Sequence, residues 1–129
     1  MSRWYIDTSA ALKLVLEEAE SPALAEALED ESLELVSCLL LETELRRVVP
    51  REPGLTQVLV TELLEAIELH EVPPTVFVEA GLLPGEHLRS LHALHLAAAI
   101  RLEVDGVLTY DRRLAEAAEE LGMRVVAPV

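Results

Sequence analysis

Short apolar segments with the character of strands alternate with longer segments of helical periodicity along the whole chain of 129 residues. This alternation favours an α/β fold with a mostly parallel sheet, because each helical segment can cover the sheet while the chain returns to begin the next strand. Neither a low-complexity linker nor an internal repeat interrupts the pattern. Since 51% of the residues are hydrophobic, the chain can bury a sizeable core, and we expect one domain over residues 1–129.

The order of elements expected from these patterns is βααβααβααβαβ, to within a few residues at each boundary. Local signals set several boundaries: Thr8 or Ser9 can cap the first helix. Ser21 suits an N-cap and Pro22 the first turn of the second helix. Strands are expected over residues 3–7, 33–37, 70–72, 107–109 and 124–126. Helices are expected over residues 8–18, 21–30, 39–49, 53–69, 75–82, 86–102 and 112–121.

Two of the expected strands run directly into an aspartate, Asp7 near one end of the chain and Asp111 near the other. Only four of the 24 acidic residues are aspartates, which argues against a chance arrangement of surface charge. Ligands of open α/β sheets bind in the crevice beyond the carboxyl ends of the strands. The two carboxylates can therefore meet in one site, provided that their strands are neighbours in the sheet.

The formal net charge of −14 argues against a protein that grips nucleic acid through a broad basic surface. It is compatible with a nuclease, because clustered carboxylates can hold divalent cations that bridge to phosphate oxygens. It also suits a basic protein partner. Composition therefore leaves a metal-dependent enzyme open and points away from simple electrostatic binding of nucleic acid.

Cysteine usage and hydropathy indicate a soluble cytoplasmic protein. Cys38 is the one cysteine, so an internal disulfide cannot form, and the compartment is expected to be reducing. A metal site built on thiolates would need ligands of other types. No apolar run approaches the ~20 residues that span a bilayer, so we expect no membrane partner.

Four segments occur in a characteristic order and cover almost the whole chain: Tyr5–Ala10, Ser37–Arg47, Leu88–Ala97 and Leu108–Leu114. Together they resemble the motifs of the PIN-domain ribonucleases of the VapC toxin type. The resemblance implies a PIN-like three-layer α/β/α fold with a mostly parallel central sheet. It further implies a metal-dependent endoribonuclease that uses Mg²⁺ or Mn²⁺, acts on RNA, forms a homodimer and is neutralised by a VapB-like antitoxin with a basic tail.

By match to these motifs, Asp7, Glu44 and Asp111 correspond to three acids of the family, which implies metal binding and catalysis. The acid that the family carries in the long helix is replaced by His92. Hard cations favour oxygen ligands over imidazole, so this change should lower the affinity for Mg²⁺. A neutral imidazole can still ligate Mn²⁺ or accept a proton near neutral pH, which makes His92 a fourth candidate catalytic residue.

In an active site of this kind, the metal ions lower the pKa of a bound water, which attacks the RNA phosphodiester. The ions also offset the charge that develops on the phosphate and leaving oxygens. Thr8 or Ser9, at the start of the helix that follows the first acid, can orient a ligand through its hydroxyl and the neighbouring backbone N–H groups.

Simpler roles compete with these assignments. Asp7 and Asp111 can serve only as N-caps, for which aspartate is a favoured residue. Glu42 lies two residues from Glu44, but on a helix it would point elsewhere, and the motif favours Glu44. His95, three residues after the histidine of the long helix, is flanked by apolar residues, which favours a core histidine hydrogen-bonded to backbone over a metal ligand.

Two other functions stay open at this point. A weakened PIN domain, disarmed by His92, would survive as a binding or regulatory partner. An acidic-pocket phosphatase or receiver-like module would form an aspartyl phosphate. That second function is disfavoured, because no further acid follows Asp7 within two residues and Lys13 is the only lysine. The RNA sequence preference depends on loops and surface shape, so the sequence does not define it.

Overall fold

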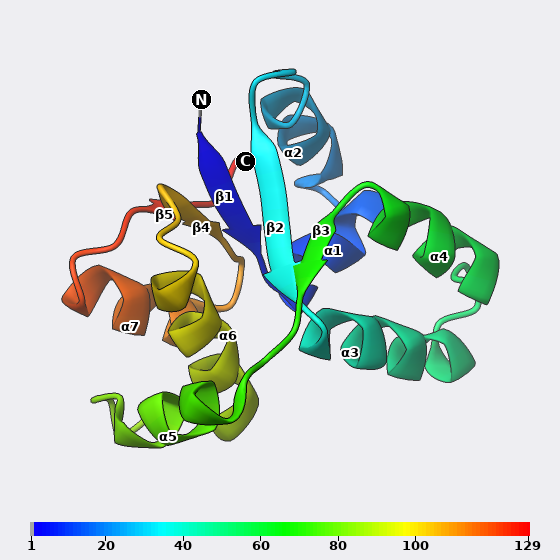
Figure 1. Ribbon diagram of the computed structural model, residues 1–129. Coiled ribbons are helices and arrows are strands. Elements are labelled where there is room, and N and C mark those ends of the chain that lie inside the picture. The colour runs from blue at the N-terminus through cyan, green and yellow to red at the C-terminus, as the bar shows by residue number, and fades with distance from the viewer. Residues whose placement is uncertain (1) are drawn as a thin grey trace.

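The structure is a computed structural model that describes residues 2–129, in which a five-stranded sheet is flanked by helices on both faces (Figure 1). None of the helices in this described part is long and apolar enough to cross a membrane. The elements follow the expected order, with one additional 3₁₀ turn. The strands are β1 (Arg3–Ile6), β2 (Glu34–Cys38), β3 (Glu68–His70), β4 (Gly106–Leu108) and β5 (Val125–Val126). The helices are α1 (Thr8–Val15), α2 (Ser21–Ala27), α3 (Leu40–Val48), η1 (Val49–Arg51), α4 (Gln57–Glu65), α5 (Pro74–Leu82), α6 (Ser90–Arg101) and α7 (Arg112–Glu120).

All neighbouring strands are parallel, and their order is β3-β2-β1-β4-β5. The chain thus starts at the centre of the sheet, builds outward through β2 and β3, and returns to the other side of β1 for β4. The register pairs Tyr5 with Val36 on one side and with Val107 on the other. The adjacency of β1 and β4, on which a shared site depends, is therefore present. It lies where the strand order reverses, the usual location of a ligand crevice in such sheets.

The core is divided by the sheet, because successive side chains of β1 point to opposite faces. Ile6 is fully buried against residues from α1 to α4. Tyr5 is fully buried on the other face, where it packs with Ala98 and Ala99 of α6. Figure 1 shows α5, α6 and α7 gathered on the side of the sheet opposite α1. The three-layer α/β/α fold and the parallel sheet predicted above are confirmed.

The prediction of one helix over residues 53–69 and a strand over 70–72 was wrong. The helix α4 begins later, because the hydroxyl of Thr56 accepts a hydrogen bond from the backbone N–H of Leu59 and caps it. It ends at Glu65 because β3 pairs with β2 from Glu68 onward. Apolar spacing continues through this junction, but the backbone hydrogen bonds of the sheet replace those of the helix.

Other boundaries moved for local reasons. The first helix is capped by Asp7 rather than by the hydroxyl residues that follow it. Ser21 does not cap α2: its hydroxyl donates to the Leu16 carbonyl and accepts from the Glu18 N–H, which turns the chain between α1 and α2. The helix α6 starts at Ser90 rather than at residue 86, after a turn in which Gly85 has a φ of 118°.

Close packing at the centre of the sheet predicts a strong effect of Gly106→Val. A Cβ at this position would lie 3.1 Å from Cγ2 of Val126 and 3.3 Å from Cδ1 of Trp4. We expect the free energy of unfolding in urea to fall by about 1–3 kcal/mol, as for other overpacked cores. Gly54→Ala is the matched control, since a Cβ there meets nothing within 4 Å. Equal stability of the two variants would contradict the packing described.

Candidate active site

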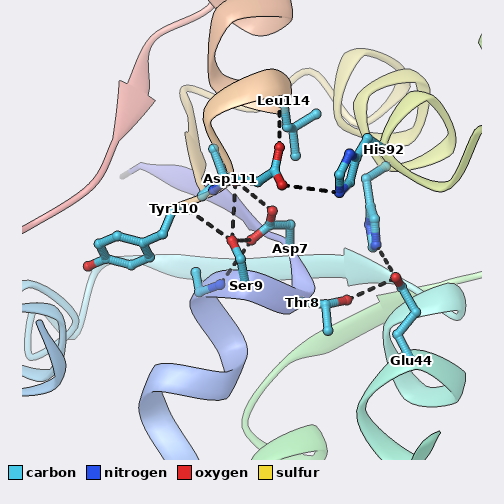
Figure 2. Close-up of polar contacts among 11 residues, drawn as sticks. Asp7, Thr8, Ser9, Glu44, His92, Tyr110, Asp111 and Leu114 are labelled. Carbon is cyan, nitrogen blue, oxygen red and sulfur yellow. Dashed lines mark hydrogen bonds and ion pairs between the residues drawn. The ribbon is translucent and has the colours of Figure 1, made fainter. Parts of the chain in front are cut away.

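The candidate site lies where the carboxyl ends of β1 and β4 meet the N-termini of α1 and α7 (Figure 2). Asp7 follows β1 directly and Asp111 comes three residues after β4. The backbone N–H of Asp7 donates to the Leu108 carbonyl, which extends the pairing of the two strands to the site. Glu44 on α3 and His92 on α6 point to the same region. The structure therefore brings all four predicted residues to one end of the sheet.

The carboxylate of Asp7 is buried, with 2% of the residue exposed, and three donors surround it. Oδ1 accepts from the Ala10 N–H at 3.0 Å and from the Ser9 hydroxyl at 2.7 Å. Oδ2 accepts from the Thr109 hydroxyl at 2.5 Å. Burial raises the pKa of Asp7 above its ordinary value, and these hydrogen bonds act in the opposite direction.

Two hydroxyl side chains fix the strand ends to each other. The Ser9 hydroxyl, which donates to Asp7, also accepts from the backbone N–H of Tyr110 at 2.9 Å. The Thr109 hydroxyl likewise donates to Asp7 and accepts from the N–H of Asp111 at 3.0 Å. The turn after β4 is therefore held to the start of α1 through polar contacts, so the two aspartates have a fixed relation.

Asp111 caps α7 with one oxygen and faces an imidazole with the other. Its Oδ1 accepts from the Leu114 N–H at 3.0 Å, and its Oδ2 lies 3.5 Å from Nε2 of His92. Asp7 caps α1 in the same way. Both aspartates thus do what the simpler interpretation proposed, yet capping uses only one oxygen of each carboxylate. Capping and a role in the site are compatible.

Glu44 reaches the site from α3, whereas Glu42 points away and pairs with Arg46 at 3.0 Å. Oε1 of Glu44 accepts from the Thr8 hydroxyl at 2.8 Å and lies 2.5 Å from Nε2 of His95. Burial acts to raise the pKa of Glu44, but its contacts with His95 outweigh burial and lower the pKa. Thr8 therefore orients a carboxylate, one of the roles considered for this hydroxyl.

His95 is a core histidine, 1% exposed, as its apolar neighbours predicted, but the prediction of backbone partners was wrong. Its Nδ1 lies 2.7 Å from the Tyr5 hydroxyl, and its Nε2 contacts Glu44. Burial acts to lower the pKa of His95, yet the interactions with Cys38 and Glu44 dominate and raise the pKa to about 9. At neutral pH this imidazole is therefore positively charged and donates to Glu44.

His92 lies about one turn before His95 on α6 and is nearer the surface. About a quarter of its side chain is exposed (26%), and its Nε2 faces Asp111. Its Nδ1 is buried and has no hydrogen-bond partner among the described residues. The two histidines, three residues apart, thus contact different acids and do not converge on one point.

Carboxylate oxygens give the site the donor chemistry of a hard cation site. Within residues 2–129, however, no three His, Cys, Asp or Glu side chains are grouped closely enough to hold one ion together. Mg²⁺ keeps several waters and commonly binds through one or two carboxylates, so it does not require such a group. The residues present fit a hydrated divalent cation better than an all-protein cage.

Sequence comparison decides the family. The sequence model of the PIN-domain family matches residues 4–120 of this chain. The chain belongs to the PIN-domain family. Among curated relatives, Ribonuclease VapC35 of Mycobacterium tuberculosis is 37% identical over 129 residues, with 96% of each chain covered. Ribonuclease VapC46 of the same organism is 39% identical over 131 residues, with 99% of each chain covered. These near full-length matches place this PIN domain among the VapC ribonucleases.

Solved structures share the fold at low sequence identity. VapBC2 from Rickettsia felis, bound to a DNA fragment from its promoter, gives a TM-score of 0.74 at 11% identity, covering 98% of this chain and 99% of that one. VapC20 of Mycobacterium tuberculosis, a toxin that cleaves the sarcin–ricin loop, gives 0.73 at 12% identity, covering 88% and 94%. Both support the PIN-like arrangement of the sheet and helices.

Sequence reasoning did not single out Thr109, a further member of the site, or Tyr5, which contacts His95 in the core behind it. A usable signal existed for Thr109, which stands two residues before Asp111 at the end of a strand, much as Ser9 stands beside Asp7. No local signal exists for Tyr5. Its contact with His95 joins residues 90 positions apart, one on β1 and the other on α6.

The raised pKa of His95 predicts that its contribution to stability depends on pH. Its folded-state pKa of about 9 exceeds the ordinary 6.5, so the contribution is fully present below pH 6.5 and is lost as the pH rises through 9. Wild type should exceed His95→Gln in unfolding free energy by roughly 3 kcal/mol in the acidic part of this range. Glutamine can keep a hydrogen bond to Glu44 but carries no positive charge, and a pKa shift corresponds to about 1.4 kcal/mol per unit. The difference should shrink toward the alkaline end.

Urea denaturation of both proteins across this pH range measures the effect. Burial acts to raise the pKa of the Cys38 thiol, but its contacts with His95 and Tyr5 outweigh burial and lower that pKa. The comparison is therefore made between variants at each pH rather than along one curve. Leu24→Ala, which removes a buried apolar side chain on α2, is the control and should lose a similar amount at every pH. A difference between wild type and His95→Gln that does not change with pH would contradict the prediction.

Proposed function

We propose that this PIN domain is a metal-dependent endoribonuclease that hydrolyses RNA phosphodiester bonds as the toxin of a toxin–antitoxin pair. The observation that carries the proposal is the pair of aspartates, Asp7 and Asp111, fixed at adjacent strand ends in a chain related to VapC ribonucleases along nearly its full length. Burial of Asp7 and its raised pKa are typical of functional carboxylates, since a purely structural N-cap has no need to be buried.

Asp7, Glu44 and Asp111 are the proposed ligands of Mg²⁺ or Mn²⁺, directly or through water. Oε2 of Glu44 and Oδ2 of Asp111 remain for this purpose, because the partner oxygens accept helix or side-chain donors. Both oxygens of Asp7 already accept hydrogen bonds, and Oδ2, with the Thr109 hydroxyl as its one donor, keeps a lone pair for a cation or its water. When bound, the ion would supply a water of lowered pKa and would offset the negative charge on the phosphate oxygens.

The chain's own residues prepare this chemistry. Ser9 and Thr109 hold the Asp7 carboxylate in one orientation, which removes the cost of ordering it when the substrate arrives. The N-termini of α1 and α7 place partial positive charge near the phosphate position, since their aspartates precede the first turns. His92 can hold a proton at Nε2 beside Asp111 and pass it to a leaving oxygen.

A second function is favoured by one specific observation. Nε2 of His92 faces Oδ2 of Asp111, the oxygen that a cation would need. At position 92 the resemblance to the family implies an acid, so the negative charge that this acid would add is absent. A protonated imidazole there would compete with the cation. In that case the protein is a weakened PIN domain that acts as a binding or regulatory partner.

Cleavage of a mixed transfer and ribosomal RNA pool separates the two functions. The main proposal predicts discrete products in the presence of Mg²⁺ or Mn²⁺ that disappear with a chelator. Asp7→Asn should lower the rate by more than about 100-fold, because even contacts one step removed from a metal commonly contribute 10–100-fold. The variant should be no less stable than wild type, since burial disfavours the charge that it removes.

Asp30→Asn is the matched control, because Asp30 is exposed and contacts Ser32 rather than the site. It should cleave RNA as wild type does. His92→Asp should strengthen Mg²⁺-dependent cleavage. If wild type is silent and His92→Asp is active, the weakened PIN domain is the correct function. If both are silent with every metal, the ribonuclease proposal is wrong for these RNA classes.

We further propose a VapB-like antitoxin with a basic tail as partner, and a homodimer as the toxin's own state. Three structural neighbours support a partner of this kind, since they are toxin–antitoxin complexes named VapBC2, VapBC-1 and FitAB. The net charge of −14 favours rapid association with a basic chain. For the homodimer, exposed apolar side chains on α5, among them Phe77, Val78 and Leu82, offer a contact surface.

Association with the product of a small neighbouring reading frame tests the partner. We expect the association rate to fall by roughly tenfold or more from low to high salt, because steering by opposite charges is screened. The dissociation rate should change far less. Stopped-flow mixing at several ionic strengths measures both rates. An association rate that is independent of salt would exclude electrostatic recruitment of a basic tail.

A further inference from the structure

A buried chain of polar contacts ends at Glu44 in the candidate site, and its other members have no role in the chemistry described above. It runs from Cys38 on β2 through Tyr5 on β1 and His95 on α6 to Glu44 on α3. Only its last member reaches the site, with a side chain 20% exposed, while the side chain of His95 is 1% exposed. The chain of contacts therefore approaches the site from the core.

The geometry of these contacts restrains the imidazole on both nitrogens. Nδ1 of His95 lies 2.7 Å from the Tyr5 hydroxyl, and Nε2 lies 2.5 Å from Oε1 of Glu44. The two rings meet edge to face, with centroids 5.7 Å apart and an interplanar angle of 72°. The Tyr5 hydroxyl also contacts Sγ of Cys38 at 3.2 Å, which fixes the phenol in turn. The imidazole therefore cannot rotate without breaking a buried hydrogen bond.

Glu44 needs such a restraint because a glutamate side chain has three rotatable bonds and loses considerable rotamer entropy when it is held in one place. Two donors, Thr8 and His95, converge on the same oxygen, Oε1. Their convergence leaves Oε2 without a donor from either residue. The carboxylate is therefore held in one orientation before any ligand arrives.

We propose that His95, held by Tyr5, is a positioning residue that orients the Glu44 carboxylate toward the substrate or cation. This inference rests on the proposed function, since it assigns a task to Glu44 in the same site. It differs from that function in requiring only that Glu44 be ordered, a property that can be measured without RNA. His95 does not touch the reacting atoms, and its contribution passes through Glu44.

The kinetic test compares two substitutions of His95. His95→Leu removes both hydrogen bonds, and we expect kcat on RNA to fall about 10–100-fold with little change in KM, as for other residues that orient metal ligands. His95→Gln can place an amide N–H near the position of Nε2, so it should recover most of this loss. Mn²⁺ binding to the RNA-free protein, followed by electron paramagnetic resonance, should weaken about tenfold in His95→Leu and much less in His95→Gln.

Tyr5→Phe tests the inner part of the chain. Tyr5 acts through His95 in this proposal, so Tyr5→Phe should lower kcat in the wild-type background and have no further effect in His95→Leu. Independent, multiplicative effects would show that the two residues contribute only to packing. Leu24→Ala is the control for lost stability, because it removes a buried side chain on α2 and leaves the polar chain untouched.

A measurement on the metal-free protein separates this inference from the proposed function. NMR relaxation of the Glu44 side chain, assigned with Glu44→Gln, should report high order in wild type and in His95→Gln, and lower order in His95→Leu. If order falls in His95→Leu while wild type never cleaves RNA, the positioning role stands and the ribonuclease proposal fails. If order and kcat are the same in wild type and His95→Leu, or if Leu24→Ala lowers both equally, the positioning role is overturned.

Discussion

The buried carboxylate of Asp7 is the constraint on which the rest of the site depends. A charge with 2% exposure is costly unless donors replace the lost water, and three donors do so here. One donor is the backbone of α1, one is Ser9 in its first turn, and one is Thr109 at the end of β4. Solvating this charge therefore joins the first strand, the first helix and the fourth strand, which fixes where Asp111 stands.

The alternation of side chains along β1 extends this arrangement to both faces of the sheet. Ile6 belongs to the apolar core beneath α1 to α4, and Tyr5, on the opposite face, begins the polar chain to Glu44. One strand of four residues thus supplies an apolar anchor, a polar contact and, immediately beyond its end, a buried acid. A one-residue shift in the pairing of β1 would exchange these faces and disrupt all three contacts, so the register of the sheet determines the geometry of the site.

Sequence reasoning recovered the element order, the sheet type and the placement of four site residues at one end of the sheet, because periodicity and strand-end acids are local signals. It failed at the junction of α4 and β3, where apolar spacing continues but the hydrogen bonds of β2 capture the backbone from Glu68. It also assigned backbone partners to His95. Apolar neighbours in the sequence reveal that a side chain is buried, whereas its partners, Tyr5 and Glu44, come from distant segments that only the fold brings together.

The two histidines of α6 affect the charge of the site in different ways. His95 lies against Oε1 of Glu44, so its positive charge stabilises that carboxylate while Oε2 stays available. His92 faces Oδ2 of Asp111, the oxygen that does not cap α7, and lies closer to solvent. Oε2 of Glu44 is therefore open to a ligand, whereas Oδ2 of Asp111 already faces an imidazole. In the proposed cation site, His92 therefore makes Asp111, rather than Glu44, the carboxylate at which a cation would have to displace an existing contact.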